Sequence, residues 1–418
     1  MTELTIRMYD VGFGDCFLLT FGKGDEARHV LFDCGSISVG AKQVTTVVEH
    51  VIDSCRGADG RSRIELLVCT HRHRDHVGGF SDPRWDKVEV GEVWMPWTED
   101  PDDKLATKIR TRQSGFAATL ADALNVPGAS LDRDPLTSER SVGGRARKTM
   151  LAIALNALTN EKAMQTLHSG FSGKPPRHFL PVKDNPCEAR TLASLSGINF
   201  HILGPPRDED AIASMDPPKG GAYIARAAAG NSAPVPENCA FRPKWRLDRA
   251  EFDRRHPQTT FSTGDQKQID VLAEEPEGTV AAAIDRAVNN TSLIILIEAG
   301  NQWLLFPGDA QWGSWNSAMS NDQCRSLMKR TTFYKVGHHG SENATPKTAV
   351  EDVFKDGLIS FFSTASIKQW PNVPRAPLVD AIAKKGKIAR SDDEAIGKAA
   401  GFVVQTGLYT EWTIDTGA

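Results

Sequence analysis

The sequence predicts an α/β fold, and three observations carry this prediction. Short runs of apolar, β-branched and aromatic residues recur along both halves of the chain and are typical of buried strands. Segments with apolar residues at helical spacing separate several of these runs. Side chains able to bind metals follow directly after the runs, as expected at the carboxyl ends of strands in an α/β sheet. A chain of 418 residues with 40% hydrophobic and 24% charged residues is long enough for one large core or two.

The sequence of the N-terminal part indicates several strands and one helix. Its first two strands form a hairpin-like pair broken by a glycine-containing turn, and the last strand should pair beside the strand that precedes a histidine-rich loop. The expected strands are at 4–21 (a pair), 29–35, 64–70 and 88–95, and the helix is at 43–53.

The C-terminal part of the sequence again consists of apolar runs typical of strands. Apolar runs again end in turns that contain proline, glycine or histidine. The expected strands are at 198–206, 291–298, 302–306, 332–336 and 358–362, with helices at about 311–330 and 376–385.

We expect a single domain over residues 1–418 that carries two insertions. Apolar residues at helical spacing in 103–125 and 148–167 indicate a helical insertion at 100–180. Residues 207–278 are rich in Pro, Gly, Ala and charge and poor in branched apolar residues, which indicates a long loop or lid. Such a loop on a rigid scaffold is the expected seat of substrate choice.

Charge and cysteine content limit the classes of function. The formal charge of −4 provides no global attraction to nucleic acid or to an anionic membrane, so any polyanion site has to be local. The N-terminus lacks the apolar core of a signal peptide, and no run reaches the length of a membrane span, so we expect a cytoplasmic protein without a membrane partner. Seven scattered cysteines without a Cys-X-X-Cys pair predict reduced thiols in the core.

The most informative motif is the sequence His-Arg-His-Arg-Asp-His at positions 71–76. A lone histidine is usually structural, but only 11 histidines occur in the chain and three of them lie in this loop beside an aspartate. Imidazole nitrogens and a carboxylate at this spacing can serve two neighbouring divalent ions from one loop. The expected ligands are His71, His73, Asp75 and His76.

Two motifs in the C-terminal half complete the expected site. Asp309 follows a strand and a glycine, which predicts a carboxylate that bridges two ions. His338 and His339 lie in a glycine-bounded turn after the strand that ends near Lys335, and one of the two should be a ligand. His338 is favoured because it lies nearer the strand end, while His339 is expected either to replace it or to hydrogen-bond the substrate. A Gly-Asp turn is by itself common for backbone reasons, so the conjunction of motifs carries the prediction.

These segments together resemble the metallo-β-lactamase superfamily, and within it the branch of DNA-uptake competence proteins of the ComEC type. The resemblance covers roughly residues 4–95 and 195–390 and leaves both insertions outside. It implies a four-layered αβ/βα sandwich with two metal ions in a cleft at one edge of the two sheets. The segments that carry it are residues 11–16, 32–36, 70–79, 289–309 and 335–341.

Carried over to this chain, the resemblance assigns a role to each residue of the motifs. His71 and His73 would hold one ion, and Asp75, His76 and His338 the other, with Asp309 between them. Asp33 would orient the ligand loop, a role that outer partners of metal ligands commonly have, and Asp15 would act similarly. The roles are listed as follows: metal ligands His71, His73, Asp75, His76, Asp309 and His338; orienting residues Asp15, Asp33 and Lys335; catalytic residues Asp75, Asp309 and His339.

Two departures from the family pattern concern histidines. Many members carry a histidine at the end of the strand that here ends in Gly204 and Pro205, and members of the branch often carry one in a late turn that here corresponds to residues 370–375. The first metal site is therefore expected to be weak. His201 lies inside an apolar run, where a core or edge histidine is the more common role than a ligand.

The resemblance implies a hydrolase that uses two divalent ions, zinc or manganese, and favours a nuclease acting on DNA or RNA. Such ions activate water and stabilise both oxygens of the cleaved ester. Asp75 or Asp309 would accept the proton of the attacking water, with His339 or Lys335 near the leaving group. Cations interleaved with an aromatic residue indicate a nucleic-acid surface, although a solvated loop has the same composition. These candidate substrate residues are Arg242, Lys244, Trp245 and Arg246.

Two other functions stay open. The first is hydrolysis of a lactone, thioester, β-lactam, other small ester or cyclic phosphodiester on the same scaffold. The second is a metal-stabilised subunit whose insertions recruit a protein partner, for instance in a bacterial defence system.

Overall fold

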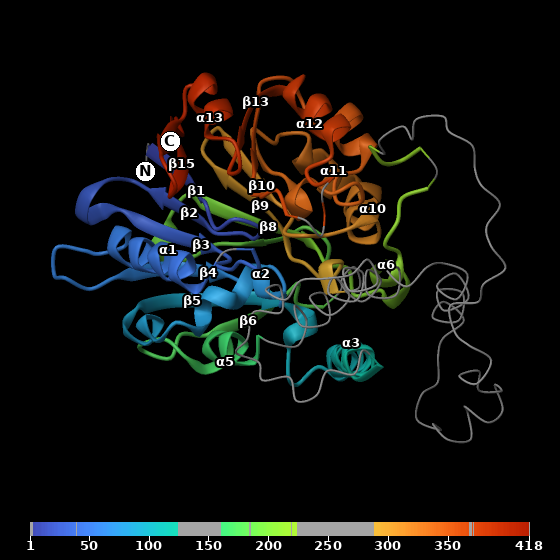
Figure 1. The fold of residues 1–418 in the computed structure, drawn as a ribbon, viewed down its shortest axis with the longest axis horizontal. Helices are drawn as coiled ribbons and strands as arrows, with labels where there is room; N and C mark the ends of the chain where they lie inside the picture. Colours follow the sequence, from blue (N-terminus) through green and yellow to red (C-terminus); the bar gives the residue numbers. More distant parts are fainter. Residues whose placement is uncertain are drawn as a thin grey trace, which may run out of the picture.

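Two mixed β-sheets form the centre of the protein and pack face to face (Figure 1). The computed structural model shows the α/β class expected from the sequence. It describes residues 3–38, 40–123, 160–183, 185–218, 220–223, 288–367, 370 and 372–417.

The first sheet has eight strands, of which β3 to β6 run parallel and the others antiparallel to their neighbours. The predicted hairpin is β1 with β2, and the predicted neighbour of the strand before the histidine loop is β5 beside β4. The spatial order is β14 (Val403–Gln405), β15 (Tyr409–Asp415), β1 (Glu3–Tyr9), β2 (Phe17–Phe21), β3 (Arg28–Phe32), β4 (Arg63–Val68), β5 (Glu89–Pro96) and β6 (Arg177–Leu180).

The second sheet has seven strands and, like the first, combines a parallel part with an antiparallel part. Strands β10 to β13 run parallel, whereas β7 to β10 are antiparallel to one another. The order is β13 (Gly386–Arg390), β12 (Leu358–Phe362), β11 (Phe333–Lys335), β10 (Gln302–Phe306), β9 (Ile294–Ala299), β8 (Ile198–Gly204) and β7 (Glu188–Arg190).

Side chains that alternate along the strands fill the space between the sheets. Leu4 and Ile6 of β1 are fully buried there, as the period of two in their sequence predicts. Phe32 of β3 stacks on Phe306 of β10 with ring centroids 4.3 Å apart and so joins the two sheets directly. Both phenylalanines end strands whose next residues enter the site described below, so this contact fixes the distance between its two halves.

Helices cover the outer faces of both sheets (Figure 1). α1 packs its valines, among them Val47 and Val51, on the first sheet, and α10 packs Trp315 on the second. The helices are α1 (Ala41–Ser54), α2 (Arg74–Val77), α3 (Lys104–Ala123), α5 (Glu161–Ser169), α6 (Glu209–Ala213), α10 (Trp312–Ser320), α11 (Asp322–Met328), α12 (Ala376–Ala383) and α13 (Glu394–Ala400).

The structure confirms most of the elements predicted from the sequence and adds short ones. β6, β7 and β14 have only three or four residues each, and β13 and β15 are rich in polar residues, so none of these strands forms a long apolar run in the sequence. The first helix of the expected helical insertion is present as α3. Residues 124–159 of the expected helical insertion and most of the expected loop at 207–278, including Arg242, Lys244, Trp245 and Arg246, lie outside the described residues.

The cysteines divide into two groups. Cys16, Cys34, Cys55 and Cys69 are free and buried, which confirms the expectation of core thiols for these four. The expectation is wrong for Cys187 and Cys324, which form a disulfide with Cα atoms 5.5 Å apart. The two residues are 137 positions apart in sequence, so only the packing of the β7 region against α11 brings them together.

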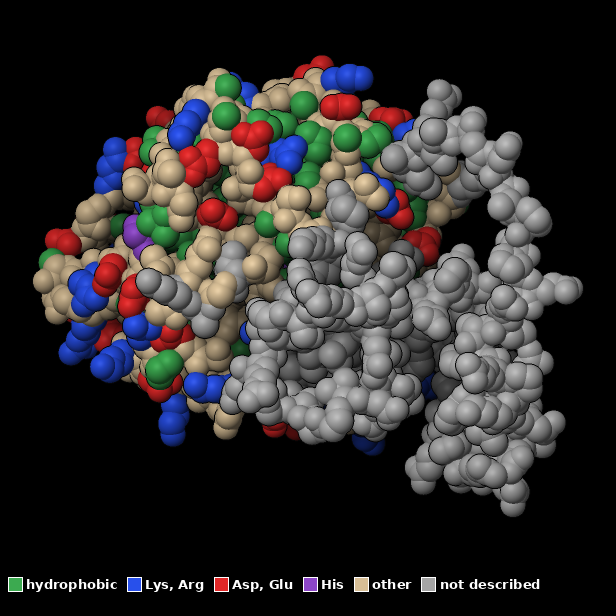
Figure 2. All heavy atoms as spheres, viewed as in Figure 1, with side chains coloured by type: hydrophobic (Ala, Val, Ile, Leu, Met, Phe, Trp, Pro, Cys, Tyr) green, Lys and Arg blue, Asp and Glu red, His purple; other side chains and the backbone are tan. Residues whose placement is uncertain are grey.

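The described surface mixes charges of both signs. Figure 2 shows Lys and Arg side chains interspersed with Asp and Glu over the visible face, in keeping with the small formal charge. Within the described residues, no helix combines the length and the apolar character that crossing a bilayer requires.

His29 of β3 gives the fold a predicted pH dependence. Burial, followed by the charges of Arg28 and Arg7, lowers the pKa of His29 to about 4. The unfolded chain takes up a proton near pH 6.5, whereas the folded protein does so only near pH 4, so stability falls as the pH decreases between these values. We expect this group to contribute about 3 kcal/mol to the loss.

Urea unfolding of the wild type and of His29→Asn at pH 7 and pH 4.5 measures this contribution. The stability difference between the two pH values should be smaller in the variant. An equal pH dependence in both proteins would show that His29 does not resist protonation in the fold.

Candidate metal centre

Loops from both sheets meet where parallel strands end. β3 leads into Asp33 and β4 into the loop that carries His71, while in the second sheet β10 leads into Asp309 and β11 into His339. The loop between β1 and β2 adds Asp15, whose backbone N–H donates to the Asp75 carbonyl oxygen at 2.9 Å. The carboxyl ends of strands in both sheets thus supply the polar groups of one site.

Two glycines permit this convergence. Gly35 lies so close to the next loop that a Cβ would be 2.4 Å from the Arg74 carbonyl oxygen. Gly308 has φ +55°, which favours glycine, and a Cβ there would be 2.8 Å from the Cβ of Thr70. The glycine directly before Asp309 therefore allows the second sheet's loop to approach the first sheet.

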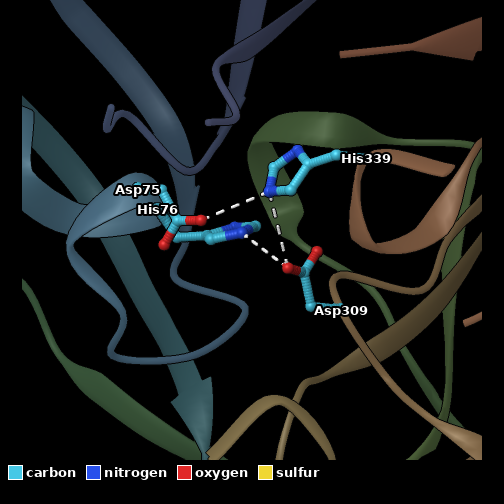
Figure 3. A group of neighbouring side chains, drawn as sticks. All are labelled: Asp75, His76, Asp309 and His339. Atoms are coloured by element: carbon cyan, nitrogen blue, oxygen red, sulfur yellow. Dashed lines mark hydrogen bonds and ion pairs between the residues drawn. The ribbon is translucent and has the colours of Figure 1, made fainter. Parts of the chain in front are cut away.

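Asp75, His76, Asp309 and His339 form the centre of the site (Figure 3). One donor atom from each lies within 4.8 Å of the other three, and all four residues are buried. The Nε2 atom of His76 is 3.1 Å from Asp309 Oδ2, and the Nε2 atom of His339 is 3.3 Å from Asp75 Oδ2 and 3.6 Å from Asp309 Oδ2. Two imidazoles and two carboxylates thus direct their donor atoms at one another.

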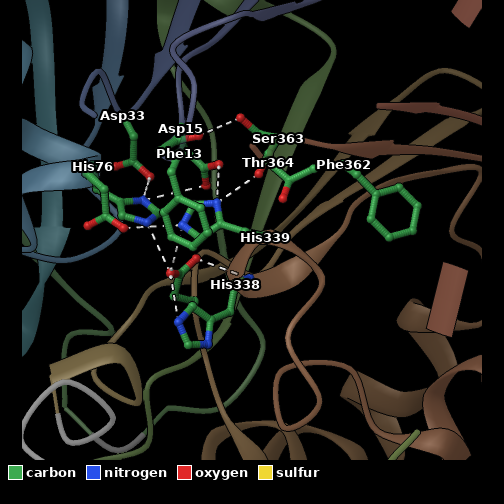
Figure 4. A network of polar contacts seen from close by, with 12 residues as sticks. Phe13, Asp15, Asp33, His76, His338, His339, Phe362, Ser363 and Thr364 are labelled. Atoms are coloured by element: carbon green, nitrogen blue, oxygen red, sulfur yellow. Dashed lines mark hydrogen bonds and ion pairs between the residues drawn. The ribbon is translucent and has the colours of Figure 1, made fainter. Parts of the chain in front are cut away.

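The second nitrogen of each imidazole is held by an oxygen acceptor (Figure 4). His76 Nδ1 lies 2.8 Å from Asp33 Oδ2, and His339 Nδ1 lies 2.8 Å from the Ser363 carbonyl oxygen. Each Nδ1 therefore carries the hydrogen and donates it, so the lone pair of the neutral ring is on Nε2, which faces the carboxylates. Asp33 is fixed in turn by hydrogen bonds from the Thr70 N–H and hydroxyl, at 2.8 and 2.6 Å.

His71 and His73 form a second donor pair beside this group. His71 Nε2 is 3.1 Å from His73 Nδ1, and the ring of His71 lies 4.1 Å from that of His76 between centroids. Burial, followed by the neighbouring His76 and His73, lowers the pKa of His71 well below its usual value. A neutral imidazole is the form that binds a metal ion.

Lys335 balances part of the negative charge. Its Nζ contacts Asp15 Oδ2 and lies 3.2 Å from the Gly308 carbonyl oxygen and 3.4 Å from Asp309 Oδ1. Burial alone would lower the pKa of Lys335, but the carboxylates of Asp15 and Asp309 outweigh it and raise the pKa. The side chain is therefore a buried cation that fixes one oxygen of Asp309.

Four carboxyl groups and one ammonium group share this buried volume. Asp15, Asp33, Asp75 and Asp309 are each no more than 4% exposed, and Lys335 is the ammonium group among them. Burial would raise the pKa of Asp309, but His76, Lys335 and His339 lower it well below its usual value, so the group is ionised. The carboxylates of Asp309, Asp15 and Asp33 outweigh burial and raise the pKa of His76, because they stabilise positive charge on that ring.

The donor set fits divalent metal ions. Ligands of a tetrahedral zinc ion with bonds of about 2.0–2.1 Å lie about 3.3 Å from one another. The separations of 3.1 Å between His71 and His73, 3.1 Å between His76 and Asp309, and 3.3 Å between His339 and Asp75 all match this value. The outer hydrogen bonds of His76 and His339 are those that hold metal-binding histidines in proteins.

The structure brings together nearly all the residues predicted from the sequence but reverses the order of the two late histidines. His339, and not His338, lies against Asp75. Both residues have left-handed backbone, with φ +43° and +55°, so the turn, and not the distance from the strand end, decides which ring enters the cluster. His338 lies at the rim with 17% of its side chain exposed and its Nε2 3.9 Å from Asp309 Oδ2.

The suggestion that His339 or Lys335 lies near a leaving group stays a prediction. Their exposed fractions are 0% and 2%, and both side chains contact carboxylates of the site. His201 has the structural role that its sequence favours, since its Nε2 is 3.2 Å from Glu298 Oε2 and its ring stacks on Trp303.

Several groups that position or cover the donor residues could not be predicted from the sequence. The Ser363 carbonyl is a backbone group, and Thr70 acts through its hydroxyl on Asp33. Phe13 lies with its ring centroid 4.3 Å from that of His339 and stacks on Trp370 at 5.0 Å, which covers one side of the cluster. The residue type of Trp370 and its place in the late turn gave no hint of this contact.

Comparison of the sequence with models of known protein families and with curated proteins gives no match. The chemical interpretation of the site therefore rests on its own geometry.

Replacing Asp33 tests the role of the outer hydrogen bonds. Asp33 accepts from the Thr70 N–H, the Thr70 hydroxyl and His76 Nδ1, and an amide cannot accept all three. We expect Asp33→Asn to weaken binding of Zn²⁺ or Mn²⁺ about 10- to 100-fold. Titration against a chromophoric chelator measures the affinity, with Asp59→Asn at the surface as the control. Equal affinity in both variants would contradict the assigned role.

Lys335→Met tests the buried charge balance. Loss of the ammonium leaves Asp15 and Asp309 without it, and breaking a buried ion pair from one side costs about 3–5 kcal/mol. Urea unfolding in the presence of EDTA should show this loss of stability. The double variant Lys335→Met, Asp15→Asn should recover part of it, and a strictly additive double variant would argue against direct coupling.

Proposed function

We propose that the protein is a hydrolase of the metallo-β-lactamase fold that uses two divalent metal ions. The observation that carries this proposal is the pair of adjacent donor groups at ligand-like separations, one with His71 and His73 and one with Asp75, His76, Asp309 and His339. Their position at strand ends of two packed mixed sheets supports the fold family that the sequence motifs suggest.

Asp309 is the residue that would be shared by both ions. Its Oδ1 atom is engaged by Lys335 Nζ at 3.4 Å and by the His338 backbone N–H at 3.2 Å. Its Oδ2 atom faces the Nε2 atoms of His76 and His339. The fixed Oδ1 orients Oδ2 toward the region between the donor groups, which is the arrangement a bridging carboxylate needs.

Two bound cations would supply the chemistry of ester hydrolysis by activating water and by stabilising the entering and leaving oxygens. Both oxygens of Asp309 are engaged by other groups, so Asp75 is the better candidate for accepting the proton of the attacking water. Its carboxylate is held by His339 at 3.3 Å, and its pKa is lowered because His339 and His76 outweigh the effect of burial. Asp75 is thus ionised and lies beside the donor atoms that would hold the metal ions.

A phosphodiester, and thus a nuclease activity on DNA or RNA, is the substrate class we propose. The loop that carries four of the donors also carries Arg74, which is exposed, and Arg72, which is partly exposed and pairs with the buried Glu99 at 3.7 Å; cationic side chains on this loop support an anionic substrate. The small net charge of the whole chain requires such local recognition. The imidazole-rich donor set suits zinc, and the four nearby carboxylates also suit manganese.

Cleavage assays test the proposal. The full-length protein is stripped of metal, refilled with Mn²⁺ or Zn²⁺ and incubated with single- and double-stranded DNA and RNA. Cleavage should require metal. It should fall more than about 100-fold in Asp75→Asn and in Asp309→Asn, because even outer partners of metal ligands contribute 10- to 100-fold. Asp59→Asn is the matched surface control and should cleave like the wild type.

Other outcomes would reassign the function. Turnover of small esters, lactones, thioesters or β-lactams without cleavage of nucleic acid would move the substrate class to small molecules. Bound metal without hydrolysis of any of these substrates would contradict an enzymatic role and favour a metal-stabilised subunit that binds a protein partner.

A further inference from the structure

Three aromatic rings lead from the buried donor cluster toward the surface. The ring centroid of Phe13 lies 4.3 Å from that of His339, and the centroid of Trp370 lies 5.0 Å from that of Phe13. Figure 4 shows the first of these contacts, with Phe13 beside His339. His339 is 0% and Phe13 is 4% exposed, whereas Trp370 is partly exposed. Trp370 is therefore the outermost ring of the stack.

Hydrogen bonds on both sides of Trp370 in sequence attach its surroundings to the site. Before it, the Ser363 hydroxyl donates to the carbonyl oxygen of Gly14, in the loop between β1 and β2, at 2.5 Å. After it, the Arg375 backbone N–H donates to the carbonyl oxygen of Gly340, in the turn that follows β11, at 2.9 Å. These are the two segments that carry Phe13 and His339, so the position of the indole is tied to that of the donor cluster.

The exposed part of Trp370 faces away from the stack. Phe13 lies over one face of the indole with an angle of 29° between the ring planes, so the exposed area belongs to the opposite face and to the edges. A planar aromatic surface of this kind binds nucleobases of any identity, because every base has a π-face. The described residues thus place a stacking surface one ring away from His339 and the donor cluster.

We propose that Trp370 binds the substrate by stacking on a base of single-stranded nucleic acid, while a phosphodiester of the same strand lies at the donor cluster. This inference rests on the nuclease function proposed above. A DNA strand advances about 3.4 Å per nucleotide, so the stacked base belongs to a nucleotide within a few positions of that phosphodiester. Bases inside a duplex are stacked on one another and offer no free face, so the substrate class is single-stranded DNA or RNA.

Cleavage of two single-stranded oligomers by the full-length protein loaded with Mn²⁺ tests the inference. One is oligothymidylate, and the other has the same length and charge but abasic tetrahydrofuran units in place of the nucleosides. The ratio of kcat/KM for the two oligomers measures what the bases contribute. Trp370→Ala should lower this ratio about 5- to 150-fold, the loss expected for one stacked base, and Trp370→Phe should retain most of it.

Trp412→Ala is the matched control. Trp412 on β15 is also partly exposed and stacks on a phenylalanine, Phe333, at the beginning of β11. This variant should keep the wild-type ratio. Binding is measured separately, without catalysis, by titrating the metal-stripped protein with oligothymidylate and following tryptophan fluorescence, which should be quenched less in Trp370→Phe than in the wild type. Thermal unfolding checks that each variant folds.

The outcomes separate this inference from the proposed function. A purely structural Trp370 would change kcat/KM for both oligomers equally, and an unchanged ratio in Trp370→Ala would overturn the inference while the nuclease stands. Quenching that depends on Trp370, without cleavage by the wild type, would support the stacking surface and overturn the nuclease. A wild type that neither binds nor cleaves either oligomer would overturn both.

Discussion

Buried negative charge is the constraint around which the site is organised. Asp15, Asp33, Asp75 and Asp309 lie within the protein, where an uncompensated carboxylate is strongly unfavourable. Lys335 compensates one charge, and imidazoles surround the remainder with their Nε2 atoms turned inward. The proposed cations between these groups would stabilise the remaining negative charge of the buried carboxylates.

The two sheets contribute equally to meeting this constraint. The first sheet supplies the histidine loop and the aspartate that holds His76, and the second supplies Asp309, Lys335 and His339. Packing of Phe32 on Phe306 sets the separation of the two halves, so an apolar contact in the core determines the distance between metal-binding groups. Because each half supplies only part of the donor cluster, binding of a metal ion there would be coupled to the packing of the sheets.

Hydrogen bonds to the imidazole nitrogens that face away from the donor cluster fix the orientation of the rings. His76 and His339 are each held at their second nitrogen by an acceptor from another loop, which is Asp33 for His76 and the Ser363 carbonyl for His339. These contacts select the tautomer and orient the ring, and they leave little freedom to the donor atoms. The two left-handed residues His338 and His339 show that the backbone is also constrained at this point.

The sequence alone determined the α/β class, most strands and the identity of the donor residues. Hydrophobic runs and the His-Arg-His-Arg-Asp-His motif are local signals that depend on neighbouring residues, so they can be read without coordinates. No such signal marks the three-residue strand β14, the pairing of Cys187 with Cys324, or the Ser363 carbonyl. Only the tertiary structure placed His339 instead of His338 against Asp75, and it also buried Lys335 behind Asp309. Distances and ring orientations between residues far apart in sequence arise from the packing of the two sheets, which no local pattern encodes.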